Sequence, residues 1–155
     1  MSIVVTAPQA YTGDNQTTWK VFLAGAIDMG AAVDWQSEVI EHLSGYQNIA
    51  IFNPRRKAFT PDTLDEQIWW ELDALKKCNT VFMWLPKDSR APISLFEAGL
   101  YWTSGKLCIG ADPEFYRRRN LEITGKFYGV YVYHSLEETL QSLTKSLDRL
   151  GYEQL

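Results

Sequence analysis

Short, almost continuous apolar runs alternate along the chain with segments of helical periodicity, and this alternation limits the possible folds more than any other feature. A strand that is apolar on both faces must be covered on both sides, which is typical of parallel sheets joined by helical crossovers. The runs expected to form strands are 3–6, 21–24, 49–52, 80–85, 107–109 and 128–133. The sequence therefore predicts an α/β fold, a doubly wound parallel sheet with helices on both faces.

Apolar residues at spacings of three and four predict the helices between those runs. The expected helices cover 31–44, about 63–77, 93–104 and 135–150. Asp62 or Thr63 is positioned to cap the second of them. Helix 93–104 is apolar nearly all round, so we expect it to be deeply buried. In open sheets of this kind, ligands bind at the carboxyl ends of the strands. The loops that begin there follow Ala24, Phe52, Leu85 and Ile109, and we expect the ligand site among them.

Length and charge narrow the functional class. A chain of 155 residues is expected to form a single domain over residues 1–155. With 19 acidic and 15 basic residues the net charge is −4, which disfavours a nucleic-acid polymer as partner. The N-terminus has no signal-peptide pattern, and no stretch approaches the roughly 20 apolar residues of a membrane span. We therefore expect a cytoplasmic protein without membrane contact, in which Cys78 and Cys108 are reduced, packed thiols.

Glu97 is the single charged residue between Ala91 and Gly105. On a helical wheel it shares a narrow arc with Ser94 and Tyr101. A carboxylate on a buried helix has to be hydrogen-bonded, paired or functional, and in a first turn the helix dipole favours the ionised form that a nucleophile needs. The structural alternative is that Ser94 and Glu97 form an S-x-x-E capping box, in which Glu97 only caps its own helix.

Glu71 is a second acid that the pattern directs inward. It lies within the apolar arc of its helix, with Gln67 one turn earlier, and the arc is formed by Leu64, Ile68, Leu72 and Leu75. Two inward carboxylates from successive strand–helix units indicate glycosidic-bond chemistry, in which one acid attacks the sugar and the other handles protons. Burial is expected to raise the pKa of Glu71 and make it the proton donor, which leaves Glu97 ionised. Alternatively, Glu71 is a structural carboxylate that binds a backbone N–H or an arginine.

Three further segments carry weaker signals. Gly25-Ala26-Ile27-Asp28-Met29-Gly30 follows a strand but lacks the dinucleotide fingerprint, so it either brings a ligand close to the backbone or is only a turn. Asn53-Pro54-Arg55-Arg56-Lys57 either binds phosphate, is solvated, or pairs with carboxylates. Arg117-Arg118-Arg119 is interpreted as a solvated helix face. His42 and His134 have no partners at metal-ligand spacing, so we expect no metal site.

Four segments occur in an order that is similar to a known family. They are VFLAGAI at 21–27, FNPRR at 52–56, QIWWE at 67–71 and SLFEAG at 94–99. Together with GADPEFYRRRN at 110–120, they resemble the nucleoside 2-deoxyribosyltransferase family, and more narrowly its bacterial and phage deoxyribosyltransferase-like branch. The resemblance implies a flavodoxin-like fold and a transferase that needs no cofactor.

The resemblance also implies roles for individual residues. Glu97 would attack the anomeric carbon of a 2′-deoxynucleoside, and a second nucleobase would then attack the deoxyribosyl-enzyme. Glu71 matches an acid that faces base and sugar, and Asn120 matches a residue that reaches the site of a neighbouring subunit. The family's acid shortly before the nucleophile is absent, with Ser94 as its candidate replacement. The predicted substrate contacts are Gly25, Ala26, Ile27, Asp28, Asn53, Gln67, Ser94, Tyr101 and Asn120.

Several alternatives share these residues. A hydrolase would use water in place of the acceptor base, on deoxynucleosides or deoxynucleotides, and a nucleotide- or nucleobase-binding module would keep the fold without turnover. An NAD glycohydrolase is more distant. The first loop lacks the Ser and Arg of relatives that hydrolyse deoxynucleoside monophosphates, which favours a free nucleoside.

The aromatic content predicts a homo-oligomer. The chain has 6 Trp, and two of them, Trp69 and Trp70, are adjacent on one helix. Neighbours on a helix lie about 100° apart, so both cannot face the same core. Aromatic residues are enriched at interfaces, and we expect at least one of the two to meet another subunit or a ligand.

Overall fold

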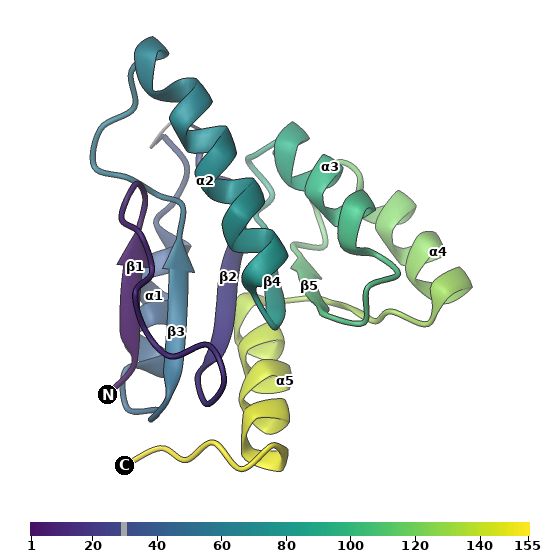
Figure 1. Ribbon diagram of the computed structural model, residues 1–155. Helices are drawn as coiled ribbons and strands as arrows, with labels where there is room; N and C mark the ends of the chain where they lie inside the picture. The colour runs from purple at the N-terminus through teal and green to yellow at the C-terminus, as the bar shows by residue number, and fades with distance from the viewer. Residues whose placement is uncertain (29–30) are drawn as a thin grey trace.

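Six parallel strands form one sheet in the order β1-β3-β2-β4-β5-β6 (Figure 1). The computed structural model describes residues 1–28 and 31–155. Its strands are β1 (Ile3–Thr6), β2 (Trp19–Gly25), β3 (Ile49–Asn53), β4 (Thr80–Leu85), β5 (Leu107–Ala111) and β6 (Val132–Tyr133). The order β3-β2-β4-β5-β6 is that of a flavodoxin-like sheet, to which β1 adds a strand along the edge of β3. The predicted α/β fold is confirmed.

Helices cover both faces of the sheet, as predicted. They are α1 (Trp35–Leu43), the short 3-10 helix η2 (Pro61–Thr63), α2 (Leu64–Lys77), α3 (Pro92–Tyr101), α4 (Arg118–Tyr128) and α5 (Leu136–Arg149). Successive strand residues alternate between two cores. Phe22 and Met83 belong to the core under α2, α3 and α4, whereas Leu23 and Phe82 belong to the core under α1 and α5 (Figure 1). None of these helices is both long and apolar enough to cross a membrane.

Both termini lie at the amino edge of the sheet (Figure 1). The backbone N–H of Ser2 donates to the carbonyl of Ser44, and that of Leu155 donates to the carbonyl of Gly45. The two chain ends are therefore held at the end of α1, and the carboxyl edge stays clear of them.

The two largest differences from the predicted element boundaries lie at the start of α1 and the start of β6. The helix expected from residue 31 begins at Trp35, because Asp34 is its N-cap and accepts a hydrogen bond from the backbone N–H of Ser37 at 3.2 Å. The strand expected over 128–133 is reduced to Val132–Tyr133. It starts late because α4 continues to Tyr128 and ends at Gly129, which has a left-handed φ of 75°.

The expectation that the helix around Glu97 is deeply buried is wrong for most of its apolar side chains. Within α3, only Ser94, Glu97 and Ala98 are buried. Ile93, Phe96 and Leu100 are 61%, 62% and 52% exposed, respectively. Their spacing of three and four places them on one face, which points away from the sheet. This helix therefore has a sheet-facing side that carries the acid and an exposed apolar side.

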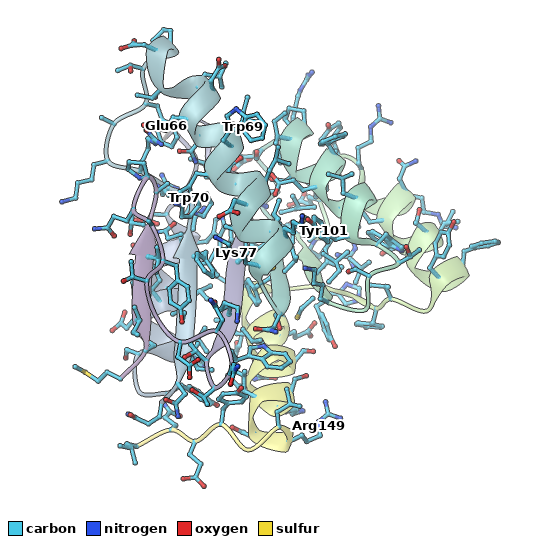
Figure 2. The ribbon with its side chains drawn as sticks, in the orientation of Figure 1. Glu66, Trp69, Trp70, Lys77, Tyr101 and Arg149 are labelled. Carbon is cyan, nitrogen blue, oxygen red and sulfur yellow. The ribbon has the colours of Figure 1, made fainter. Side chains whose placement is uncertain are left out.

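Trp69 and Trp70 diverge from α2 as their adjacency requires (Figure 2). The Trp70 ring packs at 6.3 Å from the rings of both Phe22 and Phe52. Its indole N–H donates to the carbonyl of Gln9 at 2.7 Å. The side of α2 that carries Trp69 is open, and this residue is 74% exposed.

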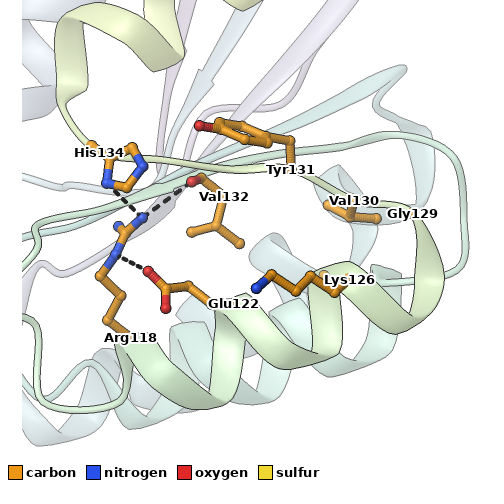
Figure 3. A pocket seen from close by; sticks show the side chains of 9 residues that line it. Arg118, Glu122, Lys126, Gly129, Val130, Tyr131, Val132 and His134 are labelled. Atoms are coloured by element: carbon orange, nitrogen blue, oxygen red, sulfur yellow. Dashed lines mark hydrogen bonds and ion pairs between the residues drawn. The ribbon is translucent and has the colours of Figure 1, made fainter.

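Arg118 is buried, so the interpretation of Arg117-Arg118-Arg119 as a solvated face is wrong for its central residue. Figure 3 shows its guanidinium between α4 and the end of the sheet. It donates to the carbonyls of Ala111, Val132 and Tyr133, and it contacts Glu122 and His134 Nδ1 at 2.8 and 3.0 Å. One side chain thus joins β5, β6 and α4, an arrangement that local periodicity does not reveal.

Replacing Arg118 with methionine is expected to lower the free energy of unfolding by about 3 kcal/mol or more, because the carbonyls of Ala111 and Val132, which are buried, and that of Tyr133, which is partly buried, lose their donor. Urea unfolding followed by circular dichroism measures the change. Arg119→Met is the matched control: its side chain is 74% exposed, and we expect a change within about 0.5 kcal/mol. Equal losses in both variants would contradict the anchoring role of Arg118.

Candidate active site

A cavity of about 570 Å³ opens at the carboxyl edge of the sheet, between β2 and β4. Its walls come from the loop after β2, from the loop and helix after β3, and from the start of α3. The strand order reverses at this point, which is where ligands bind in open parallel sheets. Of the residues predicted from the sequence, Gly25, Ala26, Ile27, Asp28, Gln67, Glu71, Ser94 and Glu97 line it.

Three other predicted contacts do not line the cavity. The Asn53 side chain is turned into its own loop, where it accepts a hydrogen bond from the backbone N–H of Arg55 at 3.0 Å. Tyr101 ends α3, and Lys106 Nζ lies 4.8 Å from the centre of its ring. Asn120 is exposed on α4, so a role at the site would require another copy of the chain. Gly30, part of the predicted glycine-containing loop, lies outside the described residues.

Much of the apolar wall was missed by the sequence reasoning. Phe59, Pro92 and Ile93 line the cavity without having been singled out. Leu64 and Ile68, which were expected to face the core, are 57% and 44% exposed and line the cavity as well. Phe59 is an isolated phenylalanine in a polar loop at the carboxyl end of a strand, and this context could have marked it as a lining residue. The wall is suited to the flat face of an uncharged ring.

Glu97 projects into this cavity from the second turn of α3. The helix begins with Pro92 in its first turn, and Ala91 occupies the N-cap position, so Ser94 and Glu97 do not form a capping box. Glu97 is 7% exposed, and its Oε2 is buried with no hydrogen-bond partner among the described residues. Burial and the nearby charge of Glu71 raise the pKa of Glu97 to about 8. The expectation that the helix dipole keeps this acid ionised is therefore wrong.

Glu71 enters the cavity from α2 with one oxygen already bound. Its Oε1 accepts a hydrogen bond from Gln67 Nε2 at 2.8 Å. Burial raises the pKa of Glu71, as predicted, whereas the Gln67 hydrogen bond and the charge of Arg56 lower it. Among the described residues Glu97 has no such contacts, and both burial and the charge of Glu71 raise its pKa. The pKa of Glu97 is thus raised as well, contrary to the prediction that this acid is the ionised member of the pair.

The family to which the chain belongs follows from a comparison of its sequence. Residues 18–115, more than half of the chain, match the family described as nucleoside 2-deoxyribosyltransferase like. The chain belongs to this family. The matched range includes every segment that lines the cavity, from Gly25 to Glu97. A search of curated proteins gave no match.

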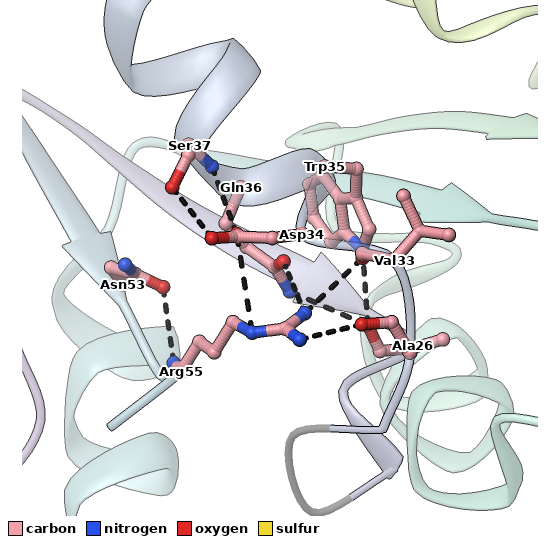
Figure 4. A network of polar contacts seen from close by, with 9 residues as sticks. Ala26, Val33, Asp34, Trp35, Gln36, Ser37, Asn53 and Arg55 are labelled. Carbon is pink, nitrogen blue, oxygen red and sulfur yellow. Dashed lines mark hydrogen bonds and ion pairs between the residues drawn. The ribbon is translucent and has the colours of Figure 1, made fainter. Parts of the chain in front are cut away.

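In this deoxyribosyltransferase-like domain, the basic run 53–57 holds the walls of the cavity. Arg55 donates to the carbonyl of Ala32 at 2.5 Å and to that of Val33 at 3.2 Å, and it thereby holds the loop after β2 (Figure 4). It also lies 3.9 Å from Asp34, and Arg56 lies 2.9 Å from Glu66. Pairing with carboxylates, one of the three interpretations of this run, is thus confirmed.

The loop after β2 is also fixed from its other side. Trp35 Nε1 and Gln36 Nε2 donate to the carbonyl of Ala26 at 3.0 and 3.4 Å (Figure 4). Gly25 has a φ of 135°, and a Cβ there would collide with the carbonyl of Trp84. The backbone that forms this wall of the cavity is therefore closely packed. Within residues 1–28 and 31–155, no group of three His, Cys, Asp or Glu is placed to hold a metal ion.

Proposed function

We propose that the protein transfers a 2-deoxyribosyl group from one nucleobase to another, with Glu97 as the nucleophile and Glu71 as the proton-handling acid. The observation that carries the proposal is the placement of two carboxyl groups, from different helices, in one largely apolar cavity of a chain that belongs to the 2-deoxyribosyltransferase-like family. Each acid has the raised pKa that a shared, desolvated pair produces.

A pair that carries one proton and one negative charge fits the stoichiometry of the transfer. The proton passes from Glu97 through Glu71 to the nucleobase, the bond between C1′ and the base nitrogen breaks, and the electron pair leaves with the base. The Glu97 carboxylate then forms an ester with C1′, and the released base is neutral. In the second half, Glu71 takes a proton from the incoming base, whose nitrogen attacks C1′ and regenerates Glu97.

The charge of the lining favours a free nucleoside over a nucleoside monophosphate. Asp28, Glu71 and Glu97 line the cavity, and no Lys or Arg among the described residues does so. A phosphate monoester would bring up to two negative charges toward these acids without a cation to balance them. The apolar wall around Phe59 and Ile93 is instead able to contact a nucleobase.

Incubation of a deoxynucleoside with and without a second nucleobase tests the proposal. Chromatography should detect a new deoxynucleoside only when the second base is present. Free deoxyribose in both samples would favour the hydrolase, in which water takes the place of the acceptor. Binding of nucleosides without release of base would contradict catalysis and favour a binding module.

We expect the protein to form a homo-oligomer through α2 and α3. Trp69 on α2 and the face formed by Ile93, Phe96 and Leu100 on α3 are exposed, and both helices border the cavity. Association with a second copy would cover these side chains, and light scattering at micromolar concentration should give a mass above 17.8 kDa. Phe96→Asp should shift the mass toward the monomer, whereas Ile3→Asp, on the edge strand β1, should not. A monomeric mass for the unmodified protein would contradict this expectation and the proposed role of Asn120.

A further inference from the structure

The loop after β3 contains a buried cation, Arg56, that takes no direct part in the proposed reaction. Arg56 is 7% exposed, although its neighbour Lys57 is exposed. Its Nη1 contacts Glu66 Oε1 at 2.9 Å, and the Glu66 side chain is 57% exposed. Burial of a guanidinium is costly, and a carboxylate that is more than half in water compensates for it only in part. The other hydrogen bond of Arg56 joins it to Gln67, which lines the cavity.

Gln67 connects Arg56 to the acid pair. Arg56 Nε donates to Gln67 Oε1 at 2.6 Å, so the amide nitrogen of Gln67 has to face the opposite way. Nε2 donates to the carbonyl of Pro54 at 2.8 Å and to Glu71 Oε1 at 2.8 Å. The amide is therefore held by three partners, and the direction of its hydrogen bond to Glu71 is determined by the arginine. This leaves the other oxygen of Glu71, Oε2, to meet a substrate.

The same contacts make the two acids unequal. The Gln67 hydrogen bond and the charge of Arg56 both lower the pKa of Glu71 and oppose the effect of burial. Among residues 1–28 and 31–155 Glu97 has no corresponding partner, and Glu71 is the nearby charge that acts on it. Within this part of the chain Glu71 is thus the member of the pair that is connected to a cation, and the connection runs through a single side-chain amide.

We propose that Arg56 is a positioning residue of the acid pair: through the Gln67 amide it orients Glu71 and makes Glu71 the member that receives the proton and returns it at the nucleobase. This inference rests on the proposed function for its reaction, but the contacts that carry it are independent of turnover. An arginine is suited to this position because its planar fork donates to Gln67 and Glu66 from adjacent nitrogens.

The direct test follows the ionisation of Glu71 in the full-length protein. NMR of protein labelled with 13C at the glutamate carboxyls gives the titration of each group, and the Glu71 signal is identified by its absence from Glu71→Gln. In Arg56→Met, Glu71 should ionise at a pH that is higher by roughly half a unit or more. Lys57→Met is the matched control, since it removes an equal charge from the adjacent exposed position, and it should leave the titration unchanged. An unchanged Glu71 titration in Arg56→Met, or an equal shift in Lys57→Met, would overturn the proposal.

Kinetics provide a second measurement. Arg56→Met should shift the acid limb of the kcat profile to higher pH and lower kcat at neutral pH, with KM changed less than twofold. Arg56→Lys should restore the acid limb because it restores the charge, but not the full kcat, because an ammonium cannot reproduce the fork. An acid limb that stays in place in Arg56→Met would overturn the proposal.

The outcomes separate this inference from the proposed function. If the unmodified protein exchanges no bases but Glu71 titrates as expected in the variants, the proposed function fails and the connection from Arg56 to Glu71 stands. If Arg56→Met does not fold, Gln67→Met breaks the same connection while it leaves the guanidinium in place. Glu71 should again ionise at higher pH, and a titration like that of the unmodified protein would overturn the proposal.

Discussion

Glu97→Gln is expected to reduce base exchange by at least about 1,000-fold, which corresponds to about 4 kcal/mol of activation free energy. The amide keeps the shape of the side chain but cannot attack C1′ as an anion. The rate of exchange between two nucleobases, measured by chromatography, gives the result. Glu114→Gln, in which the original side chain is 77% exposed, is the matched control and should keep full activity. A loss of less than about tenfold in Glu97→Gln would rule out Glu97 as the nucleophile.

Although Glu97→Gln should lower activity, it is expected to raise the stability of the folded protein. Burial and the charge of Glu71 raise the pKa of Glu97 to about 8 in the folded protein, whereas the unfolded chain has the ordinary value of 4.5. Between these values the folded state carries more protons, so this group lowers the free energy of unfolding as the pH rises. Glu97→Gln lacks this penalty and should become increasingly more stable than the unmodified protein from pH 4.5 to pH 8. Urea unfolding at several pH values measures the difference.

Glu71→Gln is expected to slow exchange of natural nucleobases by about 100-fold or more, because the leaving base loses its proton donor. A substrate whose leaving group needs no proton should lose much less. The alkaline limb of the pH profile, which reports loss of the last proton from the pair, should disappear in this variant. Asp73→Asn is the matched control on the same helix, since the Asp73 side chain is 62% exposed. Equal losses on both substrates would mean that Glu71 only positions the ligand.

The strands were the most predictable part of the fold. The runs 3–6 and 80–85 match β1 and β4 at both ends, because short, almost continuous apolar runs predict strands. β4 is buried, whereas β1 lies at the edge of the sheet and exposes Ile3 and Val4. Helix α3 is a case in which apolar composition predicted the wrong burial. Its apolar residues on all sides indicated burial on all sides, but a single chain supplies neighbours for only one of them. The exposed side is the one through which we expect the protein to associate with a second copy.

At the site, the sequence could identify the acids but not the state of their protons. Periodicity placed Glu71 and Glu97 on inward arcs, and both line the cavity. Reading Ser94 as the cap, however, put Glu97 in a first turn, whereas Pro92 starts the helix earlier. The contacts that lower the pKa of Glu71 come from Gln67 and Arg56, which belong to different segments of the chain. A contact of this kind depends on tertiary placement, and local patterns do not encode it.

The two arginines after β3 bear on which nucleobases the proposed transferase would accept. Arg55 holds the loop after β2 and Arg56 holds α2, so adjacent residues fasten opposite sides of the same opening. The two sides of the opening are thus both tied to the same short segment of the chain. The stretch from Ala58 to Pro61 lies beyond both anchors and still reaches the lining. If the protein is the proposed transferase, changes in the length or bulk of this stretch are expected to admit larger or smaller nucleobases while both anchors stay in place.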